Sequence, residues 1–86
     1  MPIISQFYGI KITIFYDDHG EPHFHAYYGE HSAKFSIASG EIIVGSLPKR
    51  ASHLVSAWMK LHTKELEADW ELAKQHKVLQ FIEPLE

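Results

Sequence analysis

The spacing of apolar residues changes at Pro48, and this change constrains the fold more than any other feature of the chain. Residues 10–14 alternate between isoleucine and polar side chains, which is the period of a half-buried strand. Beyond the proline, Leu54, Trp58 and Leu61 recur at the spacing of one face of a helix. The sequence therefore predicts strands in the first half of the chain and helices in the second.

The first half divides into β-prone runs that are separated by turn-forming residues. We expect strands over residues 7–16, 23–28, 32–37 and 42–45, because β-branched and aromatic residues are frequent there. Glycine, aspartate and proline in the intervening segments favour tight turns. The expected arrangement is an antiparallel β-meander of three to four strands.

The second half predicts helices. A first helix is expected from about Pro48 to about His62, with proline in the first turn, where its missing N–H does no harm. Thr63 is the expected N-cap of a second helix, although the pattern leaves open two helices or one bent helix. Residues 78–82 are a candidate for a short C-terminal strand. The fold class is thus α+β, with residues 1–86 as a single domain.

Composition limits the classes of function. The 86 residues include no cysteine, which excludes disulfides and thiolate zinc sites. Eight basic and eleven acidic residues give a net charge of −3, which argues against a surface that covers nucleic acid broadly but leaves a local basic patch open. No apolar run can span a bilayer and no signal peptide is visible, so we expect a cytoplasmic protein without membrane contact. A domain of this size favours a small protein partner or a homo-oligomer.

Residues 17–31 hold four of the seven histidines. His23 and His25 lie two apart on an expected strand, so both imidazoles should share one face with Tyr27, while Phe24 points to the core. We expect the histidines to lie on the open face of the sheet or at its rim. Neighbouring imidazoles suit acid–base catalysis, metal ligation or anion binding, and the structural alternative is a pair of strand residues bonded to the turn backbone.

A metal site is a further interpretation of the same segment. His23, His25 and Glu30 reproduce the spacing of the first metal motif of cupins, but the chain is too short for the cupin jelly roll. A local site for a divalent metal stays open, with His19 or His31 as a third ligand. His19 is also a candidate for binding another ligand.

Two cations occupy an unusual position. Lys49 and Arg50 fall in the first turn of the expected helix, where the macrodipole disfavours positive charge. One explanation is an anion such as phosphate, held by the helix N-terminus together with both side chains. The alternative is that the two cations are solvated or paired with acidic residues.

Several motifs together resemble one known family. The motifs are FYGI at 7–10, DHGEPHFHAYYG at 18–29, LPKRASHLVSAW at 47–58, ELEADWELA at 65–73 and a terminal IEPL. They are similar to short bacterial proteins classified as domain of unknown function 4160, although Glu21 stands where the family pattern has proline. The resemblance implies a protein encoded beside another small protein, as in two-gene toxin–antitoxin or regulatory modules. It implies a partner more than a reaction.

Three functional hypotheses follow, and the sequence leaves open whether the protein is an enzyme. The first is a binding or regulatory member of a two-gene module, acting on its partner or on a nucleic acid through the histidine-rich strand and the LPKR segment at 47–50. The second is a small ribonuclease-like toxin in which His23 and His25 act as acid and base and Lys49 or Arg50 stabilises developing charge. The third is a metal-binding protein that uses histidine and glutamate.

Overall fold

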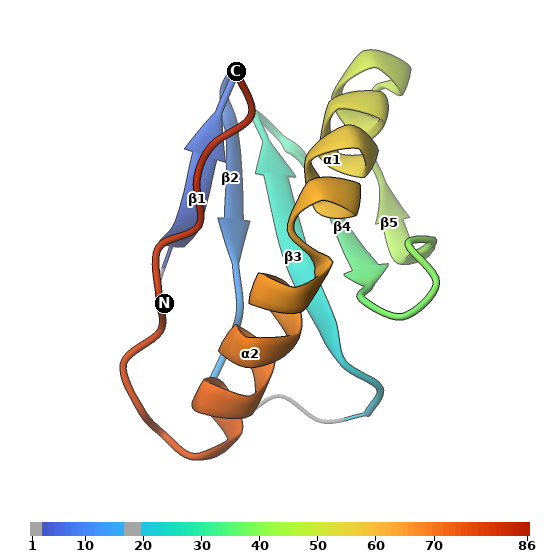
Figure 1. Ribbon diagram of the computed structural model, residues 1–86. Helices are drawn as coiled ribbons and strands as arrows, with labels where there is room; N and C mark the ends of the chain where they lie inside the picture. Colours follow the sequence, from blue (N-terminus) through green and yellow to red (C-terminus); the bar gives the residue numbers. More distant parts are fainter. Residues whose placement is uncertain (1–2, 17–19) are drawn as a thin grey trace.

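The computed structural model describes residues 3–16 and 20–86. Its elements are β1 (Ile3–Phe7), β2 (Ile10–Thr13), β3 (His23–Tyr28), β4 (His31–Ser36), β5 (Ile42–Ser46), α1 (Lys49–Leu61) and α2 (Thr63–Lys74). The five strands form one antiparallel sheet in the order β1-β2-β3-β4-β5, and both helices lie against the same face of it (Figure 1). The predicted α+β meander followed by two helices is confirmed, with five strands instead of three to four.

The additional strand results from a hairpin that the sequence interpretation missed. The expected strand over residues 7–16 is wrong, because the chain turns at Tyr8 and Gly9 and only residues 10–13 form β2. Tyr8 and Gly9 have φ values of 50° and 80°. Two successive left-handed residues are the signature of the tight turn that joins antiparallel strands with the correct twist.

The core lies between the sheet and the helices. The Phe24 and Phe35 rings are parallel with centroids 5.3 Å apart, and the Trp58 ring meets Phe24 edge-on at 5.9 Å. All three side chains are fully buried. Burial of each contributes roughly 1.5–3 kcal/mol relative to exposure, so this cluster supplies much of the stability of a small domain.

The helical half consists of two helices and not one bent helix. α1 ends at Leu61, and His62 leaves the helical region with φ −128° and ψ 23° before α2 begins. The expectation that Thr63 caps the second helix is wrong: its Oγ1 donates to the Met59 carbonyl at 2.9 Å, and His62 occupies the N-cap position. The hydroxyl of Thr63 therefore secures the end of α1.

The last ten residues form no strand, contrary to the expectation for residues 78–82. They run beside β1 (Figure 1), where the Ile82 N–H donates to the Ile4 carbonyl at 2.7 Å. The Gln80 N–H also donates to Asp69 Oδ1 at 2.8 Å. Isolated hydrogen bonds to β1 and α2, and not a regular β-ladder, thus help to fix the segment. Among the described residues, no helix is long and apolar enough to cross a bilayer.

Ile82 should be the main apolar anchor of this segment. Its side chain is buried, whereas that of the adjacent Phe81 is 63% exposed. We expect Ile82→Ala to lower the free energy of unfolding by about 2–4 kcal/mol, because it leaves a cavity in the core. The matched control Phe81→Ala should change it by less than about 0.5 kcal/mol. Urea denaturation measures both, and equal losses would contradict the assignment.

Candidate functional site

The predicted site residues lie in two separate places along β3. The strand has six residues, so its ends are roughly 17 Å apart. His23 and His25 belong to the first half of the strand, whereas Arg50 lies near Tyr28 at the other end. The structure therefore does not bring the histidine pair and the LPKR segment into one pocket.

His23 is not exposed on the open side of the sheet or at its rim, so this expectation is wrong. Its side chain is 0% exposed, and its ring packs on Trp70 of α2 with centroids 5.0 Å apart. The ring Nδ1 lies 2.7 Å from the Glu21 carbonyl oxygen, to which it can only donate. The helix covers the first residue of β3, so His23 is a buried packing residue that also holds the preceding turn.

His25 and Tyr27 lie as expected on the face opposite Phe24, and both are half-buried. The His25 ring meets Phe15 edge-on, with centroids 4.6 Å apart. It is nearly parallel to the Tyr27 ring, at 6.4 Å and 14° between planes. These contacts form an aromatic row on the side of the sheet away from the helices.

The proposed metal ligands do not converge. The rings of His23 and His25 are 5.2 Å apart, but Glu30 follows Tyr28 at the far end of the strand. His31 begins β4 and is also at that end, while His19 lies outside the described residues. Within residues 3–16 and 20–86, no group of three histidine, aspartate or glutamate side chains is placed to hold a metal ion.

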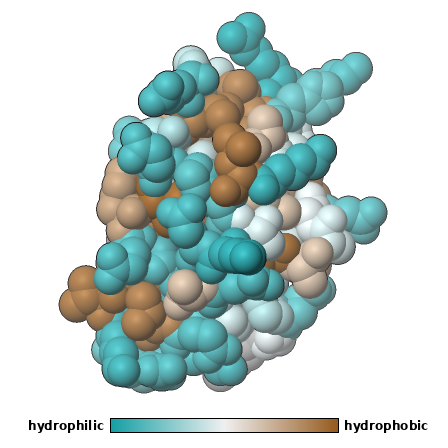
Figure 2. Space-filling model, viewed as in Figure 1, coloured by the Kyte–Doolittle hydropathy of each residue, from teal (hydrophilic) through white to brown (hydrophobic). Residues whose placement is uncertain are grey.

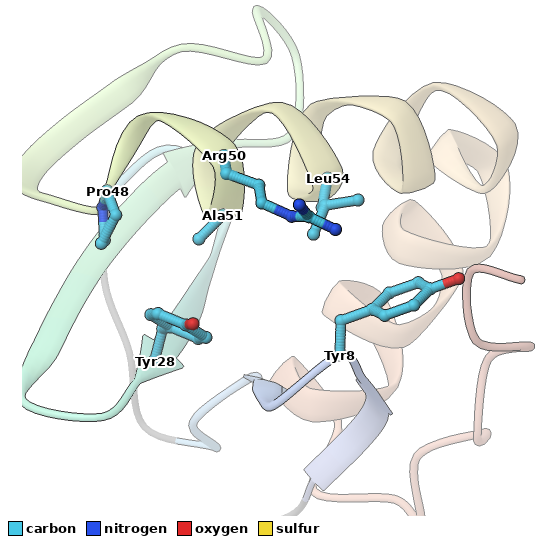
Figure 3. Close-up of a pocket in the computed structure, with 6 residues that line it drawn as sticks. All are labelled: Tyr8, Tyr28, Pro48, Arg50, Ala51 and Leu54. Carbon is cyan, nitrogen blue, oxygen red and sulfur yellow. The ribbon is translucent and has the colours of Figure 1, made fainter.

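A pocket of about 420 Å³ opens between the β1–β2 turn, the end of β3 and the start of α1. Its lining residues are Tyr8, Tyr28, Pro48, Arg50, Ala51 and Leu54. Figure 3 shows the Arg50 side chain extending across the pocket toward Tyr8, with Tyr28 on the side below Pro48 and Ala51. A guanidinium and two phenol rings thus share one opening, which we call the Arg50 pocket.

The hairpin turn and a glycine build the aromatic side of the Arg50 pocket. The turn at Tyr8 and Gly9 leaves the Tyr8 side chain 56% exposed. A Cβ at Gly9 would lie 3.4 Å from the Tyr28 ring, which is an ordinary contact distance, so the ring lies against the turn while the turn needs glycine for its φ of 80°. Sequence reasoning missed both tyrosines as pocket residues. The only signal was Gly9, because glycine is favoured where a hairpin turn requires a positive φ.

The other side of the Arg50 pocket is electropositive. Pro48 precedes α1 without a side-chain cap, and the first turn contains no acidic residue. The free N–H groups of this turn and the helix dipole favour an anion there. Both Lys49 and Arg50 are exposed, but only Arg50 lines the pocket, where it adds a positive charge. The arrangement can hold a carboxylate or a phosphate.

Asp69 is a buried acid that sequence reasoning also missed. Its side chain is fully buried in α2 beside Trp70, and Oδ1 accepts the Gln80 N–H. Oδ2 is buried without a hydrogen-bond partner among the described residues. Burial raises the pKa of this carboxyl, the bond from Gln80 opposes that shift, and the charge of Glu65 adds to it.

The raised pKa of Asp69 predicts a pH-dependent stability. Below the usual carboxyl pKa of about 3.9 the group is protonated in both states. As the pH rises through the higher folded-state pKa, the folded chain must ionise a buried group that the unfolded chain ionises readily, so stability falls. Asp69→Asn keeps the acceptor for Gln80 and removes this loss.

Urea unfolding of both proteins from about pH 4 to about pH 8 measures the effect. The unfolding free energy of the Asp69→Asn variant should increase relative to that of the natural chain as the pH rises. Glu67→Gln, which alters an exposed carboxylate of the same helix, should show no such gain. A pH-independent difference for Asp69→Asn would contradict the assignment.

Comparison with known proteins gives one match. The family model for a domain of unknown function, DUF4160, matches residues 9–71, which is more than half of the chain and confirms the resemblance seen in the motifs. No curated protein and no solved structure matches. The matched range begins in the first hairpin turn and ends within α2, so it includes most of the Arg50 pocket.

Proposed function

Because the chain belongs to the DUF4160 family, we propose that it is the binding and regulatory member of a toxin–antitoxin-like pair, and that it receives an acidic segment of its protein partner. The observation that carries this proposal is the Arg50 pocket. There, a guanidinium, two tyrosines and an uncapped helix N-terminus face one opening. A carboxylate of the partner would bind Arg50, and an adjacent apolar or aromatic side chain would lie against Tyr8 and Tyr28.

The geometry of Arg50 suits a carboxylate. Guanidinium groups bind carboxylates through two parallel hydrogen bonds, which fixes the orientation as well as the charge. Tyrosine is frequent at protein interfaces because it offers a large, rigid apolar ring with a polar tip. A pocket with one cation between two such rings therefore fits a single acidic anchor better than a run of phosphates.

The charge of the two helices supports an acidic partner. α1 carries Lys49, Arg50 and Lys60 and has no acidic residue, whereas α2 contains four acidic residues. The separation makes the first turn of α1, which forms one wall of the Arg50 pocket, more positive than α2. Complementary charge of this kind speeds association and excludes partners of the wrong sign.

The ribonuclease-like alternative has no comparable support. A general acid or base must lie within hydrogen-bond reach of the reacting proton. His23 is buried under Trp70, and neither Lys49 nor Arg50 lies near the histidine pair. The metal alternative also lacks a three-residue ligand group in the described part of the chain. We therefore propose binding and not catalysis.

Co-expression with the protein encoded beside its gene tests the proposal. Size-exclusion chromatography should show a complex, and titration calorimetry should give its affinity. We expect Arg50→Ala to weaken binding at least about tenfold, since a hydrogen bond to a charged group contributes roughly 1.5–3 kcal/mol. Lys49→Ala removes the adjacent charge outside the pocket and should weaken binding less than about threefold.

Two outcomes would overturn the proposal. One is that the chain stays alone with the neighbouring protein at micromolar concentration. The other is that Arg50→Ala and Lys49→Ala weaken the complex equally, because the pocket would then have no specific part in it. Binding of inorganic phosphate at Arg50 without any protein complex would count against an acidic protein segment as the ligand.

A further inference from the structure

The face of the sheet turned away from the helices has a distinct composition. The strand register places two rows of side chains across it, and a third pair, His23 and Ser36, is buried at one end, where the Ser36 hydroxyl donates to the Glu21 carboxylate. The first row is Gln6, Lys11, Tyr27, Ser32 and Ser46, and the second is Ile3, Thr13, His25, Lys34 and Val44. Neither row contains an acidic residue, although the whole chain has a net charge of −3. We call these ten residues the open face, although Thr13 among them is buried.

Aromatic rings occupy the middle of the open face. His25 and Tyr27 belong to β3, the central strand, and their nearly parallel rings are half-buried, so part of each is exposed to solvent. Phe15 extends this row by its edge-on contact with His25. Rings held by their neighbours on a rigid strand present fixed π surfaces at little cost in entropy.

Lysines flank the rings on both sides. Lys11 of β2 is the register partner of Tyr27, and Lys34 of β4 is the register partner of His25. The two lysines lie on either side of the central strand, so their backbones are roughly 10 Å apart. The rings therefore lie between two positive charges, with no acidic residue in either row to neutralise them.

A hollow lies beside the rings on the open face. It has a volume of about 210 Å³ and is lined in part by His25, Ser32, Lys34 and Val44. Gly45 also lines it, and a Cβ there would lie 2.3 Å from the Ser32 carbonyl oxygen, so only glycine allows β5 this close to β4. A flat group that stacks on the rings has room to extend toward β5.

We infer from these observations that the open face binds single-stranded nucleic acid. Bases would stack on His25 and Tyr27 while Lys11 and Lys34 contact the flanking phosphates. Exposed aromatics on an antiparallel sheet combined with nearby cations are how many domains hold unpaired strands, because every base has a π face and every linkage a charge. An acidic peptide would satisfy the lysines but would leave the rings without a stacking partner. The inference is independent of the Arg50 pocket, which lies at the end of β3.

Fluorescence anisotropy tests this inference with labelled oligouridine and oligothymidine of about ten nucleotides. The protein should bind with an affinity that falls as salt is raised, and the two probes distinguish RNA from DNA. Tyr27→Ala should weaken binding roughly five- to 150-fold, and Tyr27→Phe should restore it because the ring is retained. Lys11→Ala and Lys34→Ala should each reduce the slope of log affinity against log salt by about one.

The controls remove similar groups from other surfaces. Lys60→Ala deletes a cation of α1 and Phe81→Ala an exposed ring of the C-terminal segment, and neither should change affinity or slope. Lys11 is exposed, so its variant tests the face even if a Tyr27 variant fails to fold. The inference is overturned if the natural chain shows no salt-sensitive binding at about 10⁻⁴ M. It is also overturned if duplex binds as well as single strands, or if Lys60→Ala acts like Lys11→Ala.

Discussion

Trp58 joins the parts of this domain that the chain order keeps apart. Its fully buried ring contacts Phe7 of β1 with centroids 5.4 Å apart and Phe24 of β3 at 5.9 Å, so it links the edge of the sheet to its centre. Its Nε1 donates to the Glu83 carbonyl at 2.9 Å, which also ties the C-terminal segment to α1. The position of α1 over the sheet, and with it the placement of Arg50 at the end of β3, depends on Trp58 together with the buried Ala51, Val55 and Met59 of the same helix. A domain with a core this small has few other contacts to hold that orientation.

Because both helices pack on one face of the sheet, its other face and its end near the start of α1 remain accessible, and these carry the two proposed binding surfaces. Figure 2 shows the helix side, where hydrophilic residues surround separate apolar patches. β3 contributes to every layer: Phe24 to the core, Tyr27 to the open face and Tyr28 to the Arg50 pocket. The histidine-rich segment is therefore both part of the scaffold and part of the two proposed binding surfaces. Successive side chains of β3 point to opposite faces of the sheet, which separates these two roles along the strand. His23 is the exception, because α2 covers it.

The period of the apolar residues was sufficient to predict the class of the fold, the side on which Phe24 lies and the extent of α1. It failed at β1 because a bulge after Ile3 buries both Ile4 and Ser5, which removes the alternation. It failed at His23 because the contact with Trp70 is tertiary, and at Asp69 because an acid on a helix is normally exposed. The Arg50 pocket was predicted only in part. Cations are unusual in the first turn of a helix, and this placement indicated Arg50. Tyr8 and Tyr28 reach the pocket only through strand pairing, which no local pattern contains.

The extent of the family match separates the proposed binding surfaces from the two segments that complete the core. Residues 9–71 include Tyr28 and Arg50 of the pocket and also the rings and lysines of the open face, but they omit β1 and the C-terminal segment. The two omitted parts bind each other, through the hydrogen bond from Ile82 to Ile4. Tyr8 immediately precedes the match and is the one pocket residue that depends on β1 for its place. The matched part thus supplies the charged and most of the aromatic groups for both proposed ligands. β1 and the C-terminal segment close the core around Trp58. The hairpin turn after β1 also adds Tyr8 to the Arg50 pocket.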